Sequence, residues 1–575
     1  MSEEWGRFHE WMKCVGVVTF DLELGQKLEY CFPPDVKLGE KETSDVCYMA
    51  FPDSNSSNEP EIDERFFMRL AIRQRKALSI FNDFLKIHKR LRNESERYLE
   101  PETRHFSGIA FFRQVRDASI HRGFYQKAVI ILSQLPFHNL FRHIIDLTAP
   151  EYFSKGEAAL ESMAAAVNRW PSPIAGETME LPFLGSVLRV RLPAYGEAQT
   201  VRSVESNQLL PTMAPSRGTT LIPQISDLDL YRPLYTAFYH LSVLWELTLL
   251  GEPLLVVSAT PKQCSQAVLG LTSLIRPFHY CNEMRPYFTI HDSDFKDLTQ
   301  PFTNNSDSST DQNKRRQGLM LGVTNPFFCK TLTKWPHVLK CGGLDDKMSK
   351  KTKSLDKIKT LELNPGFYSK HTGYLDKDKA SIEKVVKNVL SNTRRPPEVA
   401  SAMIRRYFAT LTRSFEFPLE RYISSLMPLK KQIDPFKPPP PPHPFEVKTF
   451  LLSLSRSGPQ LTSSITGDWT SLYRDFFRRP NFFGWLERKK IEMRDKILEL
   501  HAEATSEADV LGWAEDKTEV EIMDLLLQMK QKVGDLEQLK LFRIRNGVIL
   551  QMEHLKDCLP YDTQKIFQMP QPTTL

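Results

Sequence analysis

Apolar and polar positions alternate near the start of the chain with the two-residue period of β-strands. Residues 13–33 read KCVGVVTFDLELGQKLEYCFP, and Gly25 marks a short turn in the middle. Because the side chains of a strand point alternately to opposite faces, this stretch predicts a β-hairpin. The same reasoning predicts strands at 107–115 and 124–133, on either side of a polar turn, and a further strand candidate at 47–51, CYMAF.

The apolar period then changes from two residues to between three and four. Residues 137–153 place leucine, isoleucine and phenylalanine on one stripe, and 157–169 continue in the same way, so two helices are predicted. Residues 186–193, SVLRVRLP, add a late strand, whereas the charged stretch at 65–92 fits either a helix or a mobile insert. Strands followed by helices over residues 13–170 predict an α+β layer.

A second architecture begins after the polar residues 194–218. Residues 231–250 predict a strongly apolar helix, and the β-branched run Leu254–Val257 predicts a buried strand. The strand leads directly into a helical pattern, with Thr260 as the expected N-cap and Pro261 at the first helical position. This is an α/β unit, but its turn lacks the glycines that hold phosphate at a helix N-terminus in nucleotide-binding proteins.

Further apolar runs extend this second sheet. Residues 287–290, 319–328 and 337–341 are predicted buried strands, and their alternation with helices favours a sheet that is at least partly parallel. Between two of them, residues 303–317 read TNNSDSSTDQNKRRQ, contain no apolar residue and predict a disordered loop.

The pattern is helical from about residue 380 onward. A helix is predicted at 399–411, and the aromatic-rich residues 468–490 are expected to pack in a core. Five consecutive prolines, Pro438–Pro442, predict a stiff extended spacer, with a ligand for an SH3-type groove as the alternative. The whole pattern predicts a multidomain protein of the α/β and α+β classes with a mainly helical C-terminal part.

Composition narrows the possible functions. A chain of 575 residues exceeds one ordinary core, so two to four domains are expected. The net charge is +6, from 76 basic and 70 acidic residues, which gives no reason to expect a nucleic-acid partner. The eight cysteines contain no C-x-x-C spacing, so we expect free thiols in a reducing compartment. Since neither a signal peptide nor a run of 18 apolar residues is present, we expect a cytoplasmic protein without a transmembrane segment.

The sequence contains none of the short motifs that mark common catalytic sites. Phosphate-binding loops, dinucleotide turns, zinc-protease helices and hydrolase elbows are missing, so we expect neither covalent chemistry nor a cofactor. His138 and His143 are five residues apart, which does not suit two metal ligands on one helix face. HDSDF at 291–295 offers metal-ligand residue types, but a turn that caps the next element is the favoured interpretation.

Two basic stretches allow both a structural and a functional interpretation. Arg113, Arg116 and Arg122 lie near one turn, where they can pair with acidic neighbours or stabilise phosphoryl transfer in a bound GTPase. Lys347–Lys359 contains six lysines and one aspartate. That segment is expected to be a solvated linker, and its alternative role is transient contact with anionic membrane lipids.

Several long segments are similar to a known family. FDLELGQ (20–26), FFRQVRD (111–117), RPYFTIHDSDF (285–295), LGVTNPFF (321–328) and SGPQLTSSITGDW (457–469) resemble the DENN domain-containing proteins, specifically their sixth subfamily. The similar segments span nearly the whole chain in the same order. The resemblance implies a longin-like upstream DENN module at 8–195, a central α/β DENN core at 215–345, and a helical downstream DENN module with a C-terminal extension at 346–565, interrupted by the proline linker 438–444.

The resemblance also implies an activity. Members of the family promote GDP release from Rab small GTPases, and this subfamily acts on the endosomal Rab numbered fourteen, so recruitment to recycling endosomes is expected. An exchange factor needs no nucleotide loop of its own, because its partner holds the nucleotide. The turns at 113–122 and 291–295 and the segment 322–328 are the expected contact regions. The candidate partner-binding residues are Arg113, Arg116, Arg122, His291, Asp292, Asp294, Thr324 and Asn325.

Two other functions remain open at this stage. Relatives of the folliculin type use a turn arginine to activate GTP hydrolysis in their partner, and Arg113 or Arg116 fits that role. A non-catalytic Rab-binding scaffold, with the proline run recruiting a second partner, is the other alternative.

Overall fold

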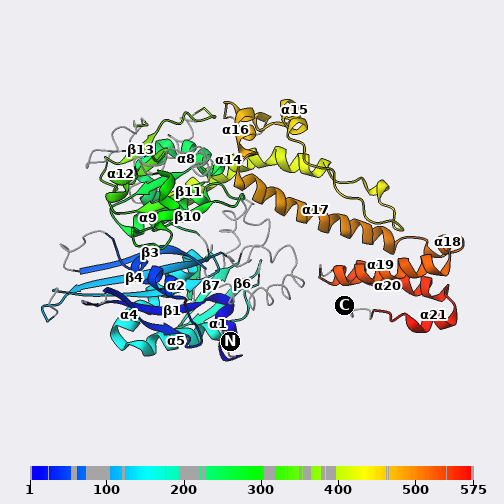
Figure 1. Ribbon diagram of the computed structural model, residues 1–575, viewed down its shortest axis with the longest axis horizontal. Helices are drawn as coiled ribbons and strands as arrows, with labels where there is room; N and C mark the ends of the chain where they lie inside the picture. Colours follow the sequence, from blue (N-terminus) through cyan, green and yellow to red (C-terminus); the bar gives the residue numbers. More distant parts are fainter. Residues whose placement is uncertain are drawn as a thin grey trace. The chain divides into compact units, whose positions relative to one another are not determined.

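The computed structural model divides into two compact units (Figure 1). Unit 1 comprises the described residues within 1–78, 98–415 and 458–482, and unit 2 those within 416–457 and 483–575. The structure describes residues 3–21, 23, 25–53, 61–72, 104–119, 123–174, 176–192, 219–222, 225, 227–302, 318–332, 334–346, 348, 352–353, 364–376, 383, 397–461, 463, 465–538 and 541–570.

The first sheet of unit 1 is antiparallel, with the strand order β2-β1-β5-β4-β3. The strands are β1 (Cys14–Asp21), β2 (Gly25–Phe32), β3 (Glu61–Ala71), β4 (His105–Arg116) and β5 (Phe124–Ser133). The predicted hairpin at 13–33 and the strands at 107–115 and 124–133 are confirmed. Gly25 has a φ of 76°, which explains the glycine in the hairpin turn.

Helices cover both faces of this sheet (Figure 1). They are η1 (Glu3–Trp5), α1 (Gly6–Trp11), α2 (Glu40–Met49), α4 (His138–Lys155) and α5 (Glu157–Asn168). The predicted helices at 137–153 and 157–169 are therefore confirmed. Neighbouring residues of β4 point to opposite faces: Phe111 packs with α4 and α5, whereas Phe112 packs with α2.

Two predictions for this region are wrong. Residues 47–51 are not a strand, because α2 covers Glu40–Met49 and starts with the Glu42 carboxylate accepting a hydrogen bond from the Gly39 amide at 2.8 Å. The capping pair lies before the apolar run and outweighs its β-prone residues. The helix-or-insert interpretation of 65–92 fails at its start, since β3 extends through Ala71; residues 73–103 lie outside the described part.

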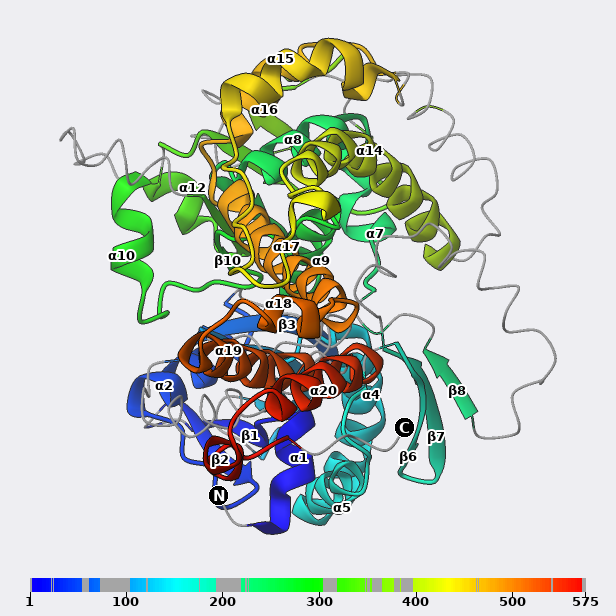
Figure 2. The same ribbon diagram turned by 90° about the vertical axis from the view of Figure 1, so that its right-hand side faces the viewer.

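A small second layer follows the helices (Figure 2). Strands β6 (Thr178–Phe183) and β7 (Ser186–Arg191) form an antiparallel hairpin, and β8 (Thr219–Ile222) pairs with β7 in parallel. The strand predicted at 186–193 is confirmed, although its partner β6 was missed.

The second sheet of unit 1 has the order β10-β11-β9-β12-β13, and only its edge strand β13 is antiparallel. Its strands are β9 (Leu254–Val257), β10 (Glu283–Arg285), β11 (Leu319–Val323), β12 (His337–Lys340) and β13 (Gly366–Ser369). The prediction of a sheet that is at least partly parallel is confirmed. Residues 287–289 are buried as expected and Ile290 is half-buried, but the stretch forms no strand. Phe288 instead donates one backbone hydrogen bond to the Gly322 carbonyl at 2.8 Å.

The helices around this sheet also refine the predictions. Thr260 caps α9 (Pro261–Ser273) by accepting a hydrogen bond from the Gln263 amide, so the predicted strand–helix unit is confirmed. The helix predicted at 231–250 is divided, and the run at 319–328 contains a strand followed by a helix. The remaining helices are α7 (Tyr231–Leu234), η4 (Tyr235–His240), α8 (Leu241–Leu250), α10 (Phe295–Thr299), η5 (Gln300–Phe302) and α12 (Phe327–Thr331). Residues 303–317 lie outside the described part.

The described residues from 397 onward are mainly helical, as predicted. Helix α14 continues through Pro418, and the aromatic residues of 468–490 are largely buried, which confirms their expected packing role. The helices are α14 (Pro397–Ser425), η7 (Lys430–Gln432), α15 (Val447–Ser457), η8 (Pro459–Leu461), α16 (Trp469–Phe476), α17 (Pro480–Ser506), α18 (Val510–Ala514), α19 (Glu519–Gln538), α20 (Phe542–Asp557) and α21 (Tyr561–Ile566). No helix among the described residues has the length and apolar character needed to cross a membrane.

Candidate functional site

The turn between β9 and α9 is closed by groups of the protein itself. The amide of Lys262, in the first turn of α9, donates to Glu64 Oε1 of β3 at 3.0 Å. The side chain of Gln263 donates to the Gly342 carbonyl at 2.7 Å and accepts from Ser258 Oγ at 2.7 Å. A helix N-terminus favours negative charge, and here a carboxylate from the first sheet lies where a phosphate lies in nucleotide-binding units.

The same helix joins the two sheets of unit 1. Strand β3 is an edge strand, and its Phe67 amide donates to Ser265 Oγ of α9 at 3.1 Å. Nearby, Arg69 donates to the Met284 carbonyl at 3.1 Å, and Arg285 donates back to the Arg69 carbonyl at 3.0 Å. Since an edge strand needs partners for its outward amides, these contacts both protect β3 and fix the two sheets to each other.

Arg285 is the centre of a buried charged cluster at this junction. Its guanidinium lies 2.9 Å from Glu283 and 2.7 Å from Asp294, and 4.0 Å from Asp292. Burial alone would lower the pKa of Arg285, but the facing carboxylates, Asp292 foremost, raise it above its ordinary value. Because a buried cation is stable only when it is paired, this cluster sets the geometry of the turn at 291–295.

The pKa values of two carboxylates in the cluster are shifted in opposite directions. Burial raises the pKa of Asp292 to about 6, against the opposing charge of Arg285. Burial also disfavours the charged form of Glu283, yet a hydrogen bond from His105 and the charge of Arg285 lower its pKa to about 2. Asp294 donates its amide to Asp292 Oδ1 at 2.8 Å, which closes the turn and supports the capping interpretation of HDSDF.

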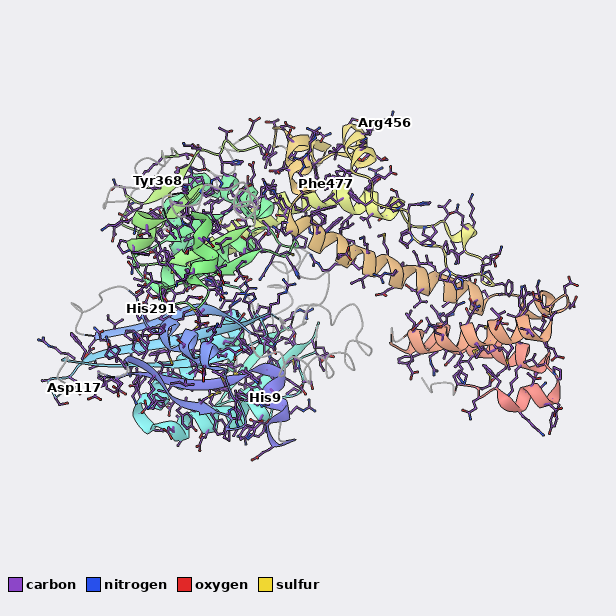
Figure 3. All side chains as sticks on the ribbon, viewed as in Figure 1. His9, Asp117, His291, Tyr368, Arg456 and Phe477 are labelled. Carbon is purple, nitrogen blue, oxygen red and sulfur yellow. The ribbon has the colours of Figure 1, made fainter. Side chains whose placement is uncertain are left out.

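A more exposed group of side chains lies beside the cluster. Figure 3 labels one of them, His291, where the two sheets of unit 1 meet. The ring of exposed His291 stacks on Tyr48 of α2 with centroids 4.5 Å apart. Asn325 donates to Asp53 Oδ2 at 3.3 Å, and its side-chain oxygen accepts from the Phe327 amide at 2.9 Å. We name Tyr48, Asp53, His291, Asn325 and Phe327 the seam patch.

The seam patch combines charge, amide and aromatic groups on one surface. Burial raises the pKa of Asp53, while the hydrogen bond from Asn325 and the nearby His291 act in the opposite direction. Phe327 is 39% exposed and makes ring contacts with Phe295. A partly exposed aromatic ring surrounded by polar groups is typical of the centre of a protein–protein interface.

The candidate residues of the two regions do not form one site. Arg113 lies directly opposite Asp63 and makes two hydrogen bonds to it, at 2.7 and 2.6 Å, while its guanidinium lies over the Phe153 ring at 4.4 Å. Exposed Arg116 is three residues further along the strand, so the two arginines point to opposite faces. Figure 3 shows the end of this hairpin, at Asp117, well apart from His291. Arg122 lies outside the described residues.

The remaining candidates lie close together, but not all are accessible. His291 and Asn325 belong to the seam patch, whereas Asp292 and Asp294 are directed towards partners inside the protein and Thr324 is buried. Sequence reasoning missed Tyr48 and Asp53, which lie in and after the stretch misread as a strand. An amphipathic reading of 40–49 with its Gly39–Glu42 start was the signal that could have placed them.

The described residues show no grouping of three His, Cys, Asp or Glu side chains able to hold a metal ion. The eight cysteines are free thiols, as predicted. Most of Lys347–Lys359 lies outside the described part, so its predicted membrane contact stays a prediction.

Comparison with known proteins identifies the family. Residues 510–570 match the DENND6 C-terminal domain, and residues 12–166 match the transport protein Avl9. Protein DENND6A of Gallus gallus is 40% identical over 572 residues, which cover 98% of this chain and 94% of the relative. Protein DENND6B of Mus musculus is 42% identical over 538 residues, covering 92% and 87% respectively. The DENND6 homolog of Dictyostelium discoideum is 30% identical over 585 residues, covering 92% and 77%.

Similarity of this extent places the chain among the DENN domain-containing proteins. It belongs to their sixth subfamily, the DENND6 family, as the sequence resemblance predicted.

Proposed function

We propose that this chain is a guanine-nucleotide exchange factor for a Rab small GTPase and that the seam patch contacts the GTPase. Membership of the DENND6 family supports the activity. One observation supports the location. The turn after β9 is closed by groups of the protein itself, whereas the seam patch, which includes the turn after β11, is exposed. In this proposal the β9–α9 turn attaches the first sheet to the second, and the turns that carry His291 and Asn325 present side chains to the GTPase.

Exchange of this kind needs no chemical step by the protein. The factor binds the nucleotide-free GTPase more tightly than the GDP-bound form, and by linkage it weakens GDP binding by the same factor. A GTPase that holds GDP with picomolar affinity has a binding free energy of about −16 kcal/mol. A preference of several kcal/mol for the empty form therefore accelerates release by orders of magnitude.

We propose three modules for the chain. The longin-like module at 8–195 corresponds to the antiparallel sheet with its helices, and the central DENN core at 215–345 to most of the parallel sheet. The downstream module and extension at 346–565 contain the long helices, with the linker at 438–444. Because α9 attaches to β3, the first two modules are expected to present one rigid surface.

The seam patch has the composition expected of an interface. An interface of ordinary size removes about 800 Å² from each partner, and a few central aromatic residues carry most of its binding energy. Phe327 is the proposed centre, with His291 and Asn325 as polar neighbours. Asp292, Asp294 and Thr324 are proposed to act by holding these turns in place.

The arginines favour exchange over activation of GTP hydrolysis. Arg113 is engaged by Asp63 and by the Phe153 ring, so its transfer to a partner's phosphates would break both contacts. Arg116 is exposed and can be tested directly. If the protein activated hydrolysis through it, Arg116→Ala would abolish phosphate release; under the exchange proposal this substitution only weakens GDP release.

The cellular setting is also part of the proposal. Action on the endosomal Rab numbered fourteen places the protein in recycling-endosome traffic, where its prenylated partner resides. Transient contact of Lys347–Lys359 with anionic lipid would assist recruitment.

A panel of GDP-loaded Rabs tests the function. We expect the full chain to accelerate loss of fluorescent GDP from the Rab numbered fourteen and to leave its intrinsic GTP hydrolysis unchanged. A pure scaffold would bind without changing the release rate, and a hydrolysis activator would stimulate phosphate release; either result contradicts the proposal.

A further inference from the structure

The proline run of unit 2 has its conformation fixed by local chemistry. Each of the residues 437–441 precedes a proline, and so does His443. A residue before proline avoids the helical region, and proline itself fixes φ near −65°, so the run is held in the polyproline II conformation. Residues 438–446 accordingly contain neither helix nor strand.

Both ends of the run are attached to helices of unit 2. At the start, Phe436 stacks on Trp513 with centroids 5.1 Å apart, and the His501 ring lies 2.7 Å from the Lys437 carbonyl. At the end, the His443 amide donates to the Leu426 carbonyl at 2.9 Å. The run is therefore a rod held at two points, and it does not need to be ordered by a partner.

One edge of the rod is accessible along its length. Polyproline II has three residues per turn, so positions three apart lie along the same edge. Pro438, Pro441 and Pro444 have this spacing, and all three are exposed. Pro440 and Pro442, on the other edges, are half-buried. We name Pro438, Pro441 and Pro444 the proline ridge.

We propose that the proline ridge docks in the aromatic-lined groove of an SH3-type domain. Such grooves accept prolines with the P-x-x-P spacing, and the ridge supplies this spacing twice in succession. Lys437 stands directly before the ridge with its side chain 76% exposed, which adds a cation for an acidic groove rim. Its ion pair with Asp434 is itself solvent-exposed, so the lysine can exchange that partner at small cost.

The preformed rod favours binding. A flexible proline-rich peptide loses conformational freedom when it docks, whereas a rod held at both ends has already lost it during folding. The ridge belongs to unit 2 and the seam patch to unit 1, so each proposal can fail while the other stands.

Binding of purified SH3 domains to the immobilised full chain tests the inference, with WW and EVH1 domains as comparators. We expect at least one SH3 domain to bind, and Pro438→Ala with Pro441→Ala and Pro444→Ala together to weaken that binding at least tenfold. Pro439→Ala is the matched control, because this exposed proline lies on another edge and should change the affinity less than twofold.

A second variant keeps the test decisive if the triple substitution disturbs folding. Lys437→Glu leaves every proline in place and should weaken SH3 binding several-fold through its charge. The inference is overturned if no SH3 domain binds, if only WW or EVH1 domains bind, or if the folded ridge variants bind as well as the wild type. GDP release by each variant, measured in parallel, keeps this result separate from the exchange activity.

Discussion

Two turns at the same edge of the parallel sheet differ in exposure: internal hydrogen bonds close one of them, and the other lies at the surface. After β9, Thr260 and the carboxylate of Glu64 accept hydrogen bonds from the first amides of α9, and the Gln263 side chain donates to the Gly342 carbonyl, which closes the turn. After β11, Asn325 and Phe327 reach the surface beside His291. The carboxyl edge of such a sheet is the usual place for ligands. In this protein one part of that edge attaches the first sheet, and the neighbouring part remains available to a partner.

The difference shows how an α/β core whose β9–α9 turn is closed by its own groups can still present exposed side chains at the same edge of the sheet. The anion-binding capacity of the α9 N-terminus is used within the molecule, which fixes the position of β3 and α2. That position in turn brings Tyr48 and Asp53 against the exposed turns. Substitutions in the closed region should therefore act on stability, and substitutions in the seam patch on exchange.

The largest effect is expected from Arg285→Ala. Removal of the buried cation takes away the ion-pair partner of Asp294 and the nearest cation of Asp292, and leaves Glu283 with His105 alone as a close ion-pair partner, which should destabilise folding by about 3–5 kcal/mol. Urea unfolding measures the change. Arg113→Ala is the control, since its more exposed pair with Asp63 should contribute about 1 kcal/mol or less. Equal losses for the two variants would contradict the role of the buried cluster.

Asp292 should make stability depend on pH. Its pKa is about 6 in the folded protein against an ordinary 3.8, and two pKa units correspond to about 3 kcal/mol. The folded state gains a proton before the unfolded state does, so this contribution is complete below about pH 4 and is lost as pH rises through about 6. The difference in unfolding free energy between wild type and Asp292→Asn should follow that curve. If the difference in unfolding free energy between the two proteins did not change from pH 4 to pH 7, the raised pKa of Asp292 would be refuted.

Phe327→Ser should affect exchange rather than folding. As the proposed central aromatic of the interface, Phe327 should contribute about 2 kcal/mol to Rab binding, so GDP release should slow at least tenfold. Phe483→Ser is a matched control, because Phe483 is 54% exposed in unit 2, outside the seam patch. If the control slows exchange as much as Phe327→Ser does, the contact surface has been misplaced.

Glu64→Gln should have the smallest effect. The amide keeps the shape and one acceptor oxygen but loses the charge at the α9 N-terminus, at a cost of about 0.5–1 kcal/mol in stability. Thermal unfolding at low salt gives the most sensitive comparison. Since Glu64 lies in the closed region, the maximal exchange rate of the folded variant should match that of the wild type; a tenfold loss would show that this turn contacts the partner.

Sequence reasoning succeeded where local chemistry decides the structure. The cap at Thr260, the proline after it and the apolar run before it are enough to predict the β9–α9 unit from local sequence. It failed at 47–51 and 287–290, where apolar residues suit a strand but tertiary packing imposes another conformation. The second stretch passes so close to β11 that a side chain at Gly322 would meet the Pro286 carbonyl.

The site was predictable only in part for the same reason. His291 and Asn325 are candidates because they lie within segments that resemble the family, 285–295 and 321–328. Their partners Tyr48 and Asp53 are more than 200 positions away in sequence. No local sequence pattern predicts the contacts of His291 with Tyr48 and of Asn325 with Asp53. Arg285 also escaped notice, since a single arginine near acidic residues does not reveal that folding buries it.

The affinity of the full chain for one Rab in two states tests the central claim most directly. Titration of the Rab numbered fourteen, once stripped of nucleotide and once loaded with GDP, measures the preference on which exchange depends. The account predicts markedly tighter binding to the stripped form, and loss of most of that preference in Phe327→Ser. Equal affinity for the two forms, in this Rab and in every other one tested, would contradict it.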